Sequence, residues 1–425
     1  MKVNLNPMQT SNSTLITAKK TAGVSIAICV FVSLLVGAIG FAVGTRYQNF
    51  FASNREFDLS EMSEVYSALN ARFDGKLDKN KLMQGAASGM ASATGDPFTS
   101  YLTAEDAKTL NSDLSGTFEG IGAELGQNSD KQLEIVSVID GSPAKKAGLQ
   151  SHDIIVLIND EKSVDWTPEK AVNIIRGKAG TTVKLTINRA GEKKEYSLTR
   201  AKITNPSVVW EISDDNGATW IENSSEEFKA KLESDGKKIG YIRISRFGDD
   251  TARLTANAAR QMKNANVNGI VLDLRGNGGG YVNAAQGVAN LWLKSGDIIV
   301  EEKTGDVIRD KVKANGNPIL LDVPTTVLID GGSASASEIV AGALRDNDAA
   351  VLIGTQSYGK GSVQELVNLR SGSMLKITIA RWYTPKGVNI NGDGLKPDIE
   401  VEMTADEYNS GNDKQRNKAI EKLNQ

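Results

Sequence analysis

The chain has 425 residues, of which 40% are hydrophobic and 24% are charged, and its formal net charge is −3. One hydrophobic core rarely grows beyond about 250–300 residues, so this length predicts two or three domains. The charge balance excludes a global basic field for nucleic acid, and a single cysteine with a single histidine argues against a disulfide framework or a metal site.

The N-terminal segment is polar up to Lys19-Lys20, and an uncharged apolar run follows from Val24 to Val43. At about 1.5 Å per residue this run spans the ~30 Å hydrocarbon core of a bilayer. The lysines before it predict a cytoplasmic N-terminus and an external remainder. The alternative is export with a signal peptide cleaved near Ala42, but the run is longer than a usual signal segment.

Residues 55–112 show apolar side chains at helical spacing, and Thr103 with Asp106 predicts a capped helix start. Residues 114–203 form a β-rich unit with a helix over 167–176, capped by Thr167. Its strands are expected at 133–139, 153–158 and 182–187.

Residues 204–235 are less regular, and their role is not predicted. From Ile239 the pattern alternates between strands and helices, with strands expected over 239–244, 269–274 and 325–330. This alternation is typical of an α/β sheet covered by helices.

The segment Asp330-Gly-Gly-Ser-Ala-Ser-Ala-Ser-Glu338 leads from the last of these strands into a helix rich in small residues. A helix N-terminus has free N–H groups and a partial positive charge, which suits an oxyanion. The N–H of Ala336, directly after Ser335, would be one donor. Serines also cap helices, so the motif alone does not distinguish a nucleophile from a cap.

Lys360 lies in Gly359-Lys-Gly-Ser-Val-Gln364. A lysine is a base only when neutral, and burial lowers its pKa. The flanking glycines allow close backbone contact, and the Gln364 amide could orient the amine. Taken alone, the lysine fits a solvated strand residue better than a base. The only histidine, His152, lies far from Ser335 in the sequence, which disfavours a Ser-His-Asp triad.

Together these motifs resemble the carboxyl-terminal processing proteases, which are tail-specific serine peptidases of the S41 type with a PDZ domain. The resemblance runs from about Leu59 to Glu402. It is carried by ordered motifs at Asp96–Leu102, Gly120–Ala123, Asp273–Gly280, Ser333–Leu344, Gly359–Gln364, Tyr383–Gly387 and Gly394–Ile399.

The resemblance implies the catalytic roles. The middle serine of the motif, Ser335, becomes the nucleophile, Lys360 the general base and Gln364 its orienting partner. Ala336 and a glycine of the Asp273–Gly280 segment form the oxyanion hole.

For this glycine we take Gly279, with Gly280 as the near alternative. No metal or other cofactor is implied.

The β-rich unit resembles a PDZ domain, which would bind the C-terminal tail of a protein substrate as an added strand. Arg176 ends its helix and is either a carboxylate or gating contact or an ordinary surface charge. The implied substrate-binding residues are Gly120, Ile121, Gly122, Ala123 and Arg176.

The expected fold is a multidomain α/β (α+β) protein with a transmembrane helix, a helical segment, a PDZ β-sandwich or barrel and a peptidase core of the ClpP/crotonase type. The boundaries are a cytoplasmic N-terminus at 1–23, the span at 24–44, helices at 45–113, PDZ at 114–204, a linker or insertion at 205–235, the core at 236–402 and a tail at 403–425.

The implied function is a serine endopeptidase anchored in a bacterial cell membrane, with its peptidase domain outside the cytoplasm, that cleaves proteins near their C-terminus. Assembly into a homo-oligomer is left open. The alternative is a non-catalytic PDZ scaffold that captures protein C-termini.

Overall fold

The structure is a computed structural model that describes residues 58–128, 130–139, 141–404, 407 and 411–425. The predicted membrane span at 24–44 lies outside these residues. Among the residues that are described, no helix is both long enough and apolar enough to cross a membrane. The chain divides into two compact units, 1–82 and 83–425, which we describe separately.

The first unit contains α2 (Ser60–Arg72) and the start of α3 (Lys79–Ser92), which continues into the second unit. Helix α2 buries none of its residues. Its apolar residues Met62 and Val65 are exposed. The helical conformation predicted for this part of the chain is confirmed, whereas its apolar residues are not buried.

In the second unit, β1 (Ser100–Leu102) precedes α4 (Ala104–Ser115). The predicted cap of α4 is confirmed, because Thr103 Oγ1 accepts the Asp106 N–H at 3.2 Å and the Asp106 carboxylate accepts the Thr103 N–H at 3.2 Å. Strand β1 was not expected, and it pairs antiparallel with β19 (Met374–Tyr383).

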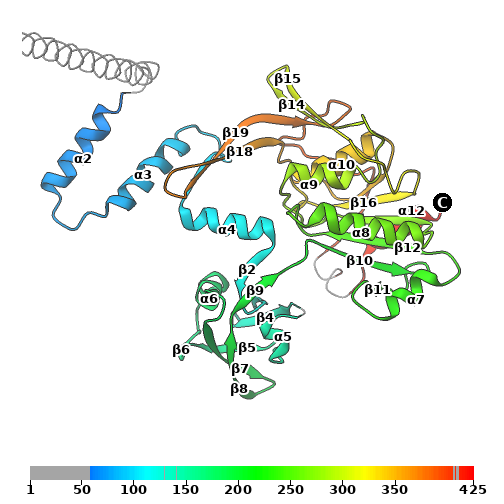
Figure 1. Cartoon of the computed structure of the whole chain (residues 1–425), viewed down its shortest axis with the longest axis horizontal. Helices are drawn as coiled ribbons and strands as arrows, with labels where there is room; N and C mark the ends of the chain where they lie inside the picture. The colour runs from blue at the N-terminus through cyan, green and yellow to red at the C-terminus, as the bar shows by residue number, and fades with distance from the viewer. Residues whose placement is uncertain (1–57, 129, 140, 405–406, 408–410) are drawn as a thin grey trace, which may run out of the picture. The chain divides into compact units, whose positions relative to one another are not determined.

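The expected PDZ region contains a six-stranded antiparallel sheet of β3 to β8, a separate antiparallel pair of β2 and β9, and two short helices (Figure 1). Alternate residues of β7, Val183, Leu185 and Ile187, are buried in its core. Thr167 caps α6, as predicted. The elements are β2 (Thr117–Gly120), β3 (Ala123–Gln127), β4 (Leu133–Val138), α5 (Pro143–Lys146), β5 (Ile154–Ile158), β6 (Glu161–Lys162), α6 (Pro168–Ile175), β7 (Thr182–Arg189), β8 (Glu192–Thr199) and β9 (Ala201–Thr204).

The expected peptidase core is built on a sheet with the strand order β11-β10-β12-β13-β16-β17-β20. From β12 onward the strands are parallel, and β10 and β11 add an antiparallel edge. Strands β13 and β16 are buried throughout, as is typical of a parallel sheet covered on both faces. The strands are β10 (Val208–Ser213), β11 (Ile221–Glu222), β12 (Ile239–Ile244), β13 (Gly269–Asp273), β16 (Thr325–Ile329), β17 (Val351–Gly354) and β20 (Ile399–Glu400).

Helices cover both faces of this sheet. On β13, Leu272 joins the apolar cluster formed with α8 (Thr251–Asn264), α9 (Val282–Ala289) and α10 (Ala336–Asp346), which lie together in Figure 1. Its neighbour Val271 points to the opposite face, where it clusters with residues of α12 (Lys414–Leu423). The core is therefore a three-layer α/β/α arrangement.

Two segments contribute to this core although the predicted boundaries leave them outside. Residues 205–235, expected as a linker or insertion, supply β10, β11 and α7 (Glu227–Glu233), and β10 pairs with β12 along its length. Residues 403–425, expected as a tail, supply α12. Both segments bury apolar side chains, Ile212 on β10 and Ile420 on α12 among them, and this burial ties them to the sheet.

A second, antiparallel sheet contains β1, β14 (Ile298–Thr304), β15 (Val307–Lys313), β18 (Ser362–Asn368) and β19. Strand β18 pairs with β19 along its whole length, with one register shift between Val363 and Gln364. The lysine segment enters this sheet directly, because Lys360 precedes β18 by two residues.

Candidate active site

Ser335 lies where the chain passes from β16 to α10. It is the N-cap residue of α10 and has φ 56° and ψ −114°. A positive φ is uncommon for a residue with a side chain, and backbone strain of this kind clusters at functional sites. Ser335 is half-buried. The turn thus presents this serine at the mouth of a helix.

The two neighbouring serines are buried, and their hydroxyl groups hydrogen-bond to backbone carbonyls of another segment. Ser333 is fully buried, and its Oγ donates to the Leu274 carbonyl at 2.8 Å. Ser337 is also fully buried, and its Oγ donates to the Asn277 carbonyl at 2.8 Å. Of the three serines, only Ser335 retains partial exposure. This arrangement favours Ser335 as the nucleophile.

Gly279 lies directly against the serine turn. A Cβ added to Gly279 would be 2.8 Å from Ser335 Cβ and 3.0 Å from the Ala336 nitrogen, and its φ is 102°. A side chain there would be both crowded and strained. Gly280 instead approaches the Phe247 carbonyl, with its added Cβ 2.1 Å from that oxygen. The structure therefore brings together Gly279, Ser335 and Ala336.

The N–H of Gly279 already has an acceptor. It donates to Asn277 Oδ1 at 2.9 Å, and the buried Asn277 donates from Nδ2 to the Ile244 carbonyl at 2.8 Å. An oxyanion at this position must take over the Gly279 N–H from Asn277. Asn277 was not predicted as a functional residue, although it belongs to the same motif as Gly279.

Lys360 sits in a segment whose backbone packs closely on another loop. A Cβ on Gly361 would lie 2.1 Å from the Asn391 nitrogen, so only glycine fits there. The predicted close approach beside the lysine is confirmed. Lys360 itself is half-buried, and its Nζ lies 5.9 Å from the centre of the Phe98 ring.

The surroundings of Lys360 favour its neutral form. Burial lowers the pKa of the Lys360 amine, and the positive charge of Lys376 on β19 lowers it further, while Glu338 opposes the shift. Lys376 was not predicted to matter, because it lies on β19, outside the Gly359–Gln364 motif. A lysine with a lowered pKa is suited to act as a base.

Glu338 connects the two motifs through their backbones. It is fully buried in the first turn of α10. Its Oε2 accepts the N–H of Ser335 at 2.7 Å and the N–H of Lys360 at 3.0 Å. Its Oε1 accepts the Ser357 hydroxyl at 2.6 Å and the Gly359 N–H at 2.7 Å. One carboxylate thus ties the serine turn to the lysine segment.

Burial raises the pKa of the Glu338 carboxyl, although its hydrogen bonds oppose the shift. Glu338 was not predicted as a site residue, and its only signal in the sequence is an acidic side chain three positions after a helix-mouth serine. In the described part of the structure, no hydrogen bond joins the side chains of Ser335 and Lys360. Such catalytic contacts often tighten only when substrate is bound.

Gln364 lies on β18 at the register shift between β18 and β19. Its Nε2 donates to Ser362 Oγ at 2.5 Å. Among the described residues it makes no hydrogen bond to Lys360. The structure therefore places Gln364 four residues from the lysine on the adjoining strand, with its amide engaged elsewhere.

The expected peptide-binding residues of the PDZ region share one cavity of about 430 Å³. The N–H groups of Ile121 and Gly122 donate to no acceptor in the described residues, so they are available to a carboxylate. The lining includes Phe118, Gly120, Ile121, Gly122, Ala123, Ile175 and Arg176.

Arg176 has a defined position beside this cavity. Its guanidinium carbon lies 5.3 Å from the centre of the Phe118 ring. The end of α6 that carries it is held by Arg200, which donates to the carbonyls of Ile175 at 2.7 Å and Ile174 at 3.0 Å. A cation fixed at the mouth of the cavity suits a carboxylate ligand.

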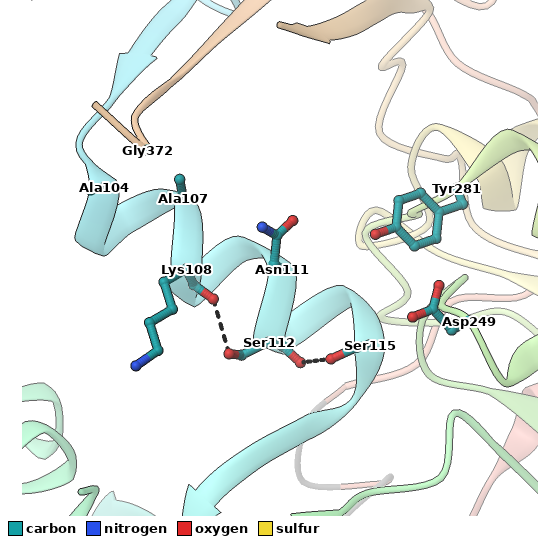
Figure 2. A pocket seen from close by; sticks show the side chains of 9 residues that line it. All are labelled: Ala104, Ala107, Lys108, Asn111, Ser112, Ser115, Asp249, Tyr281 and Gly372. Carbon is teal, nitrogen blue, oxygen red and sulfur yellow. Dashed lines mark hydrogen bonds between the residues drawn. The ribbon is translucent and has the colours of Figure 1, made fainter. Parts of the chain in front are cut away.

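A further cavity, of about 490 Å³, lies between α4 and Tyr281, the residue that follows the glycine loop (residues 275–280) in the chain (Figure 2). Polar side chains of α4, including Asn111 and Ser112, line one side, and Asp249 and Tyr281 line the other. Tyr281 directly follows Gly280 in the chain. Burial raises the pKa of the Tyr281 hydroxyl, and Asp249 adds to the shift. Most of the cavity's lining side chains are polar, and neither Ser335 nor Lys360 is among them.

These features define a PDZ-containing serine protease, and the comparisons agree. Residues 238–401 match the model of peptidase family S41, residues 111–188 match the PDZ domain, and residues 44–106 match the N-terminal domain of the activating protease CtpB.

Two curated relatives cover most of the chain. A probable CtpA-like serine protease of Staphylococcus haemolyticus (strain JCSC1435) is 33% identical over 382 residues, covering 90% of this chain and 70% of the relative. A protein of the same name from Staphylococcus aureus (strain COL) is 34% identical, covering 88% and 72%.

A solved S41 protease structure from Bacteroides fragilis NCTC 9343 has a TM-score of 0.54 and 19% identity, covering 83% of this chain and 92% of the other, and shows the same fold. The chain belongs to peptidase family S41 and is a serine protease with a PDZ domain. The predicted resemblance is confirmed, and the alternative of a non-catalytic scaffold is not favoured.

Proposed function

We propose that this protease cleaves proteins near their C-terminus with Ser335 as nucleophile and Lys360 as general base. The observation that carries the proposal is the Glu338 carboxylate, which accepts the N–H groups of both residues. A buried carboxylate with several donors is a rigid connection, and catalysis depends on holding a nucleophile and its base at a fixed separation.

The reaction follows from these positions. Neutral Lys360 takes the proton from Ser335 Oγ, which attacks the peptide carbonyl carbon to form an acyl-enzyme. The N–H groups of Ala336 and Gly279 stabilise the developing oxyanion. Protonated Lys360 then gives its proton to the leaving amine, and water releases the acyl group. Gln364 would orient the lysine after exchanging its contact with Ser362.

The PDZ cavity is proposed to select substrates by their C-terminal tail. The tail would add as a strand, with its carboxylate on the N–H groups of Ile121 and Gly122 and near Arg176.

The apolar run at 24–44 would anchor the enzyme with its peptidase domain outside the cytoplasm. Release of the full chain from membranes by an alkaline wash would contradict the anchor.

Covalent labelling tests the nucleophile. An aryl fluorophosphonate should attach to the purified chain, and peptide mapping should locate the adduct on Ser335, because an activated serine attacks phosphorus as it attacks a carbonyl. Casein should be cleaved by the unlabelled protein and not by the labelled one. An adduct on another serine, or cleavage that survives full labelling, would reject the assignment.

Arg176→Ala is expected to raise the KM for peptides with a free C-terminal carboxylate about tenfold, because it removes one charge-assisted contact. Cleavage of the same peptides with an amidated C-terminus should change little. Lys178→Ala is a matched control, since Lys178 is exposed and does not line the cavity. Equal losses for free and amidated peptides would exclude a carboxylate contact.

Activity is expected to rise with pH, because the neutral form of Lys360 is the base and its pKa is lowered from the usual value. Lys376→Met removes a repelling positive charge, so the pKa of Lys360 should increase. The pH profile of kcat/KM should then move to higher pH, with activity at neutral pH reduced and activity at alkaline pH retained. A flat profile in the wild type would count against a titrating lysine.

A further inference from the structure

The C-terminal helix α12 is connected to the start of the glycine loop by a partly buried ion pair. Arg275, the first residue of this loop, is 8% exposed. Its Nη1 and Nη2 bind the two carboxylate oxygens of Asp413 at 2.9 and 2.8 Å, and Nη1 also donates to Gln415 Oε1 at 3.0 Å. Asp413 is the N-cap residue of α12.

The adjacent Nε–Nη2 edge of the same guanidinium is held by the end of β13. Arg275 Nε and Nη2 donate to Asp273 at 3.0 and 2.6 Å, and the Tyr241 hydroxyl donates to Asp273 Oδ2 at 2.6 Å. Bidentate pairs of this kind fix the plane of the guanidinium as well as its position. Arg275 is therefore clamped between a strand of the sheet and the C-terminal helix.

The loop that begins at Arg275 leads directly to the proposed catalytic groups. Two residues on, the carbonyl of Asn277 accepts the Ala334 N–H at 3.0 Å and the Ser337 hydroxyl at 2.8 Å. Gly279 then packs against Ser335, as described above. A shift of Arg275 would thus be transmitted over four residues to the oxyanion position.

We propose that Asp413 is a positioning residue, which holds the glycine loop against Ser335 through Arg275. Asp413 lies beyond residues 238–401, the segment that matches family S41. The inference rests on the proposed function, because it assumes that the loop supplies an oxyanion donor. The C-terminal segment would then contribute to kcat, by positioning the glycine loop, as well as cover one face of the sheet.

The helix cap can be preserved while the arginine contact is removed. Asp413 Oδ1 accepts the Arg416 N–H at 2.9 Å, and both serine and asparagine are good N-cap residues. Asp413→Ser keeps a cap but is too short to hold the guanidinium, whereas Asp413→Asn keeps one oxygen for it. Ile420→Ala is the control, because it weakens the packing of α12 on the sheet without touching Arg275.

In the purified full chain, Asp413→Ser is expected to lower kcat by about tenfold or more with KM changed less than about twofold, since small misplacements of catalytic groups cost up to about 100-fold. Asp413→Asn should lower kcat less than Asp413→Ser does. Hydrogen exchange of residues 275–281 should accelerate in Asp413→Ser. Ile420→Ala should lower the thermal midpoint while kcat and this exchange remain near wild type.

A double variant separates positioning from stability. Arg275→Gln with Asp413→Ser should be no slower than Arg275→Gln alone, because both changes break one connection. If Asp413→Ser lowers the thermal midpoint like Ile420→Ala but leaves kcat unchanged, the positioning role is refuted. A wild type that neither cleaves casein nor reacts with the fluorophosphonate would instead reject the proposed function.

Discussion

Lys360→Met is expected to reduce kcat by about 10²–10⁴-fold, the range that a positioned general base contributes. Methionine has a similar length and apolar stem, so it fills the same half-buried space without a basic nitrogen. The folded state should not be weakened, because burial disfavours the ammonium form that methionine replaces. Single-turnover acylation of an activated ester should show the loss directly.

The matched control for this change is Lys376→Met, which removes the neighbouring lysine and leaves the base. Its activity should return at alkaline pH, whereas that of Lys360→Met should not return at any pH. Ser335→Ala sets the background of the assay. A Lys360→Met enzyme that retains more than about a tenth of wild-type kcat would mean that another group takes the proton.

The parts of the fold that could be predicted from sequence are those specified by local patterns. Thr103 and Thr167 cap the helices that were expected, because a cap depends on residues within one turn. The strand at 325–330 and the serine turn after it are likewise local. Ser335 could be separated from Ser333 and Ser337 only by the resemblance, and the structure adds the physical difference, which is burial of the other two.

The parts that could not be predicted depend on contacts between distant segments. Strand β10 belongs to the sheet because it pairs with β12. No pattern in the irregular segment before Ile239 predicts this pairing. Glu338 reads as an ordinary first-turn acid until Gly359 and Lys360 are brought to it. Arg275 and Asp413 are 138 residues apart in the chain. Such residues become partners only when the folded sheet brings their segments together.

The observed hydrogen bond from Gly279 to Asn277 sharpens the prediction for the oxyanion hole. Because the N–H is satisfied inside the loop, the ground state is stabilised without an oxyanion. When the tetrahedral intermediate forms, a charged acceptor competes with the neutral amide oxygen of Asn277, and hydrogen bonds to charged acceptors are stronger. The contribution of Gly279 should therefore appear in the transition state and not in substrate binding.

Gly279→Ala should consequently lower kcat by about 10²–10³-fold, the cost of losing one oxyanion donor, while KM changes little. The added methyl would lie 2.8 Å from Ser335 Cβ at a φ of 102°, so the loop must move away from the serine. Gly278→Ala is the matched control, because its Cβ would meet no atom within 4 Å and its φ is not positive. Initial rates over a range of peptide concentrations give both constants.

If Gly279→Ala and Gly278→Ala lowered kcat equally, the loop would tolerate no side chain at either position. Gly279 would then not be identified as the oxyanion donor. A large loss confined to Gly280→Ala would move the donor to the next residue, although the Phe247 carbonyl 2.1 Å from its added Cβ makes a folding defect the expected outcome there. Thermal midpoints of all three variants separate these cases. Loss of kcat in Gly279→Ala at a near-native midpoint is the result that places this glycine at the oxyanion.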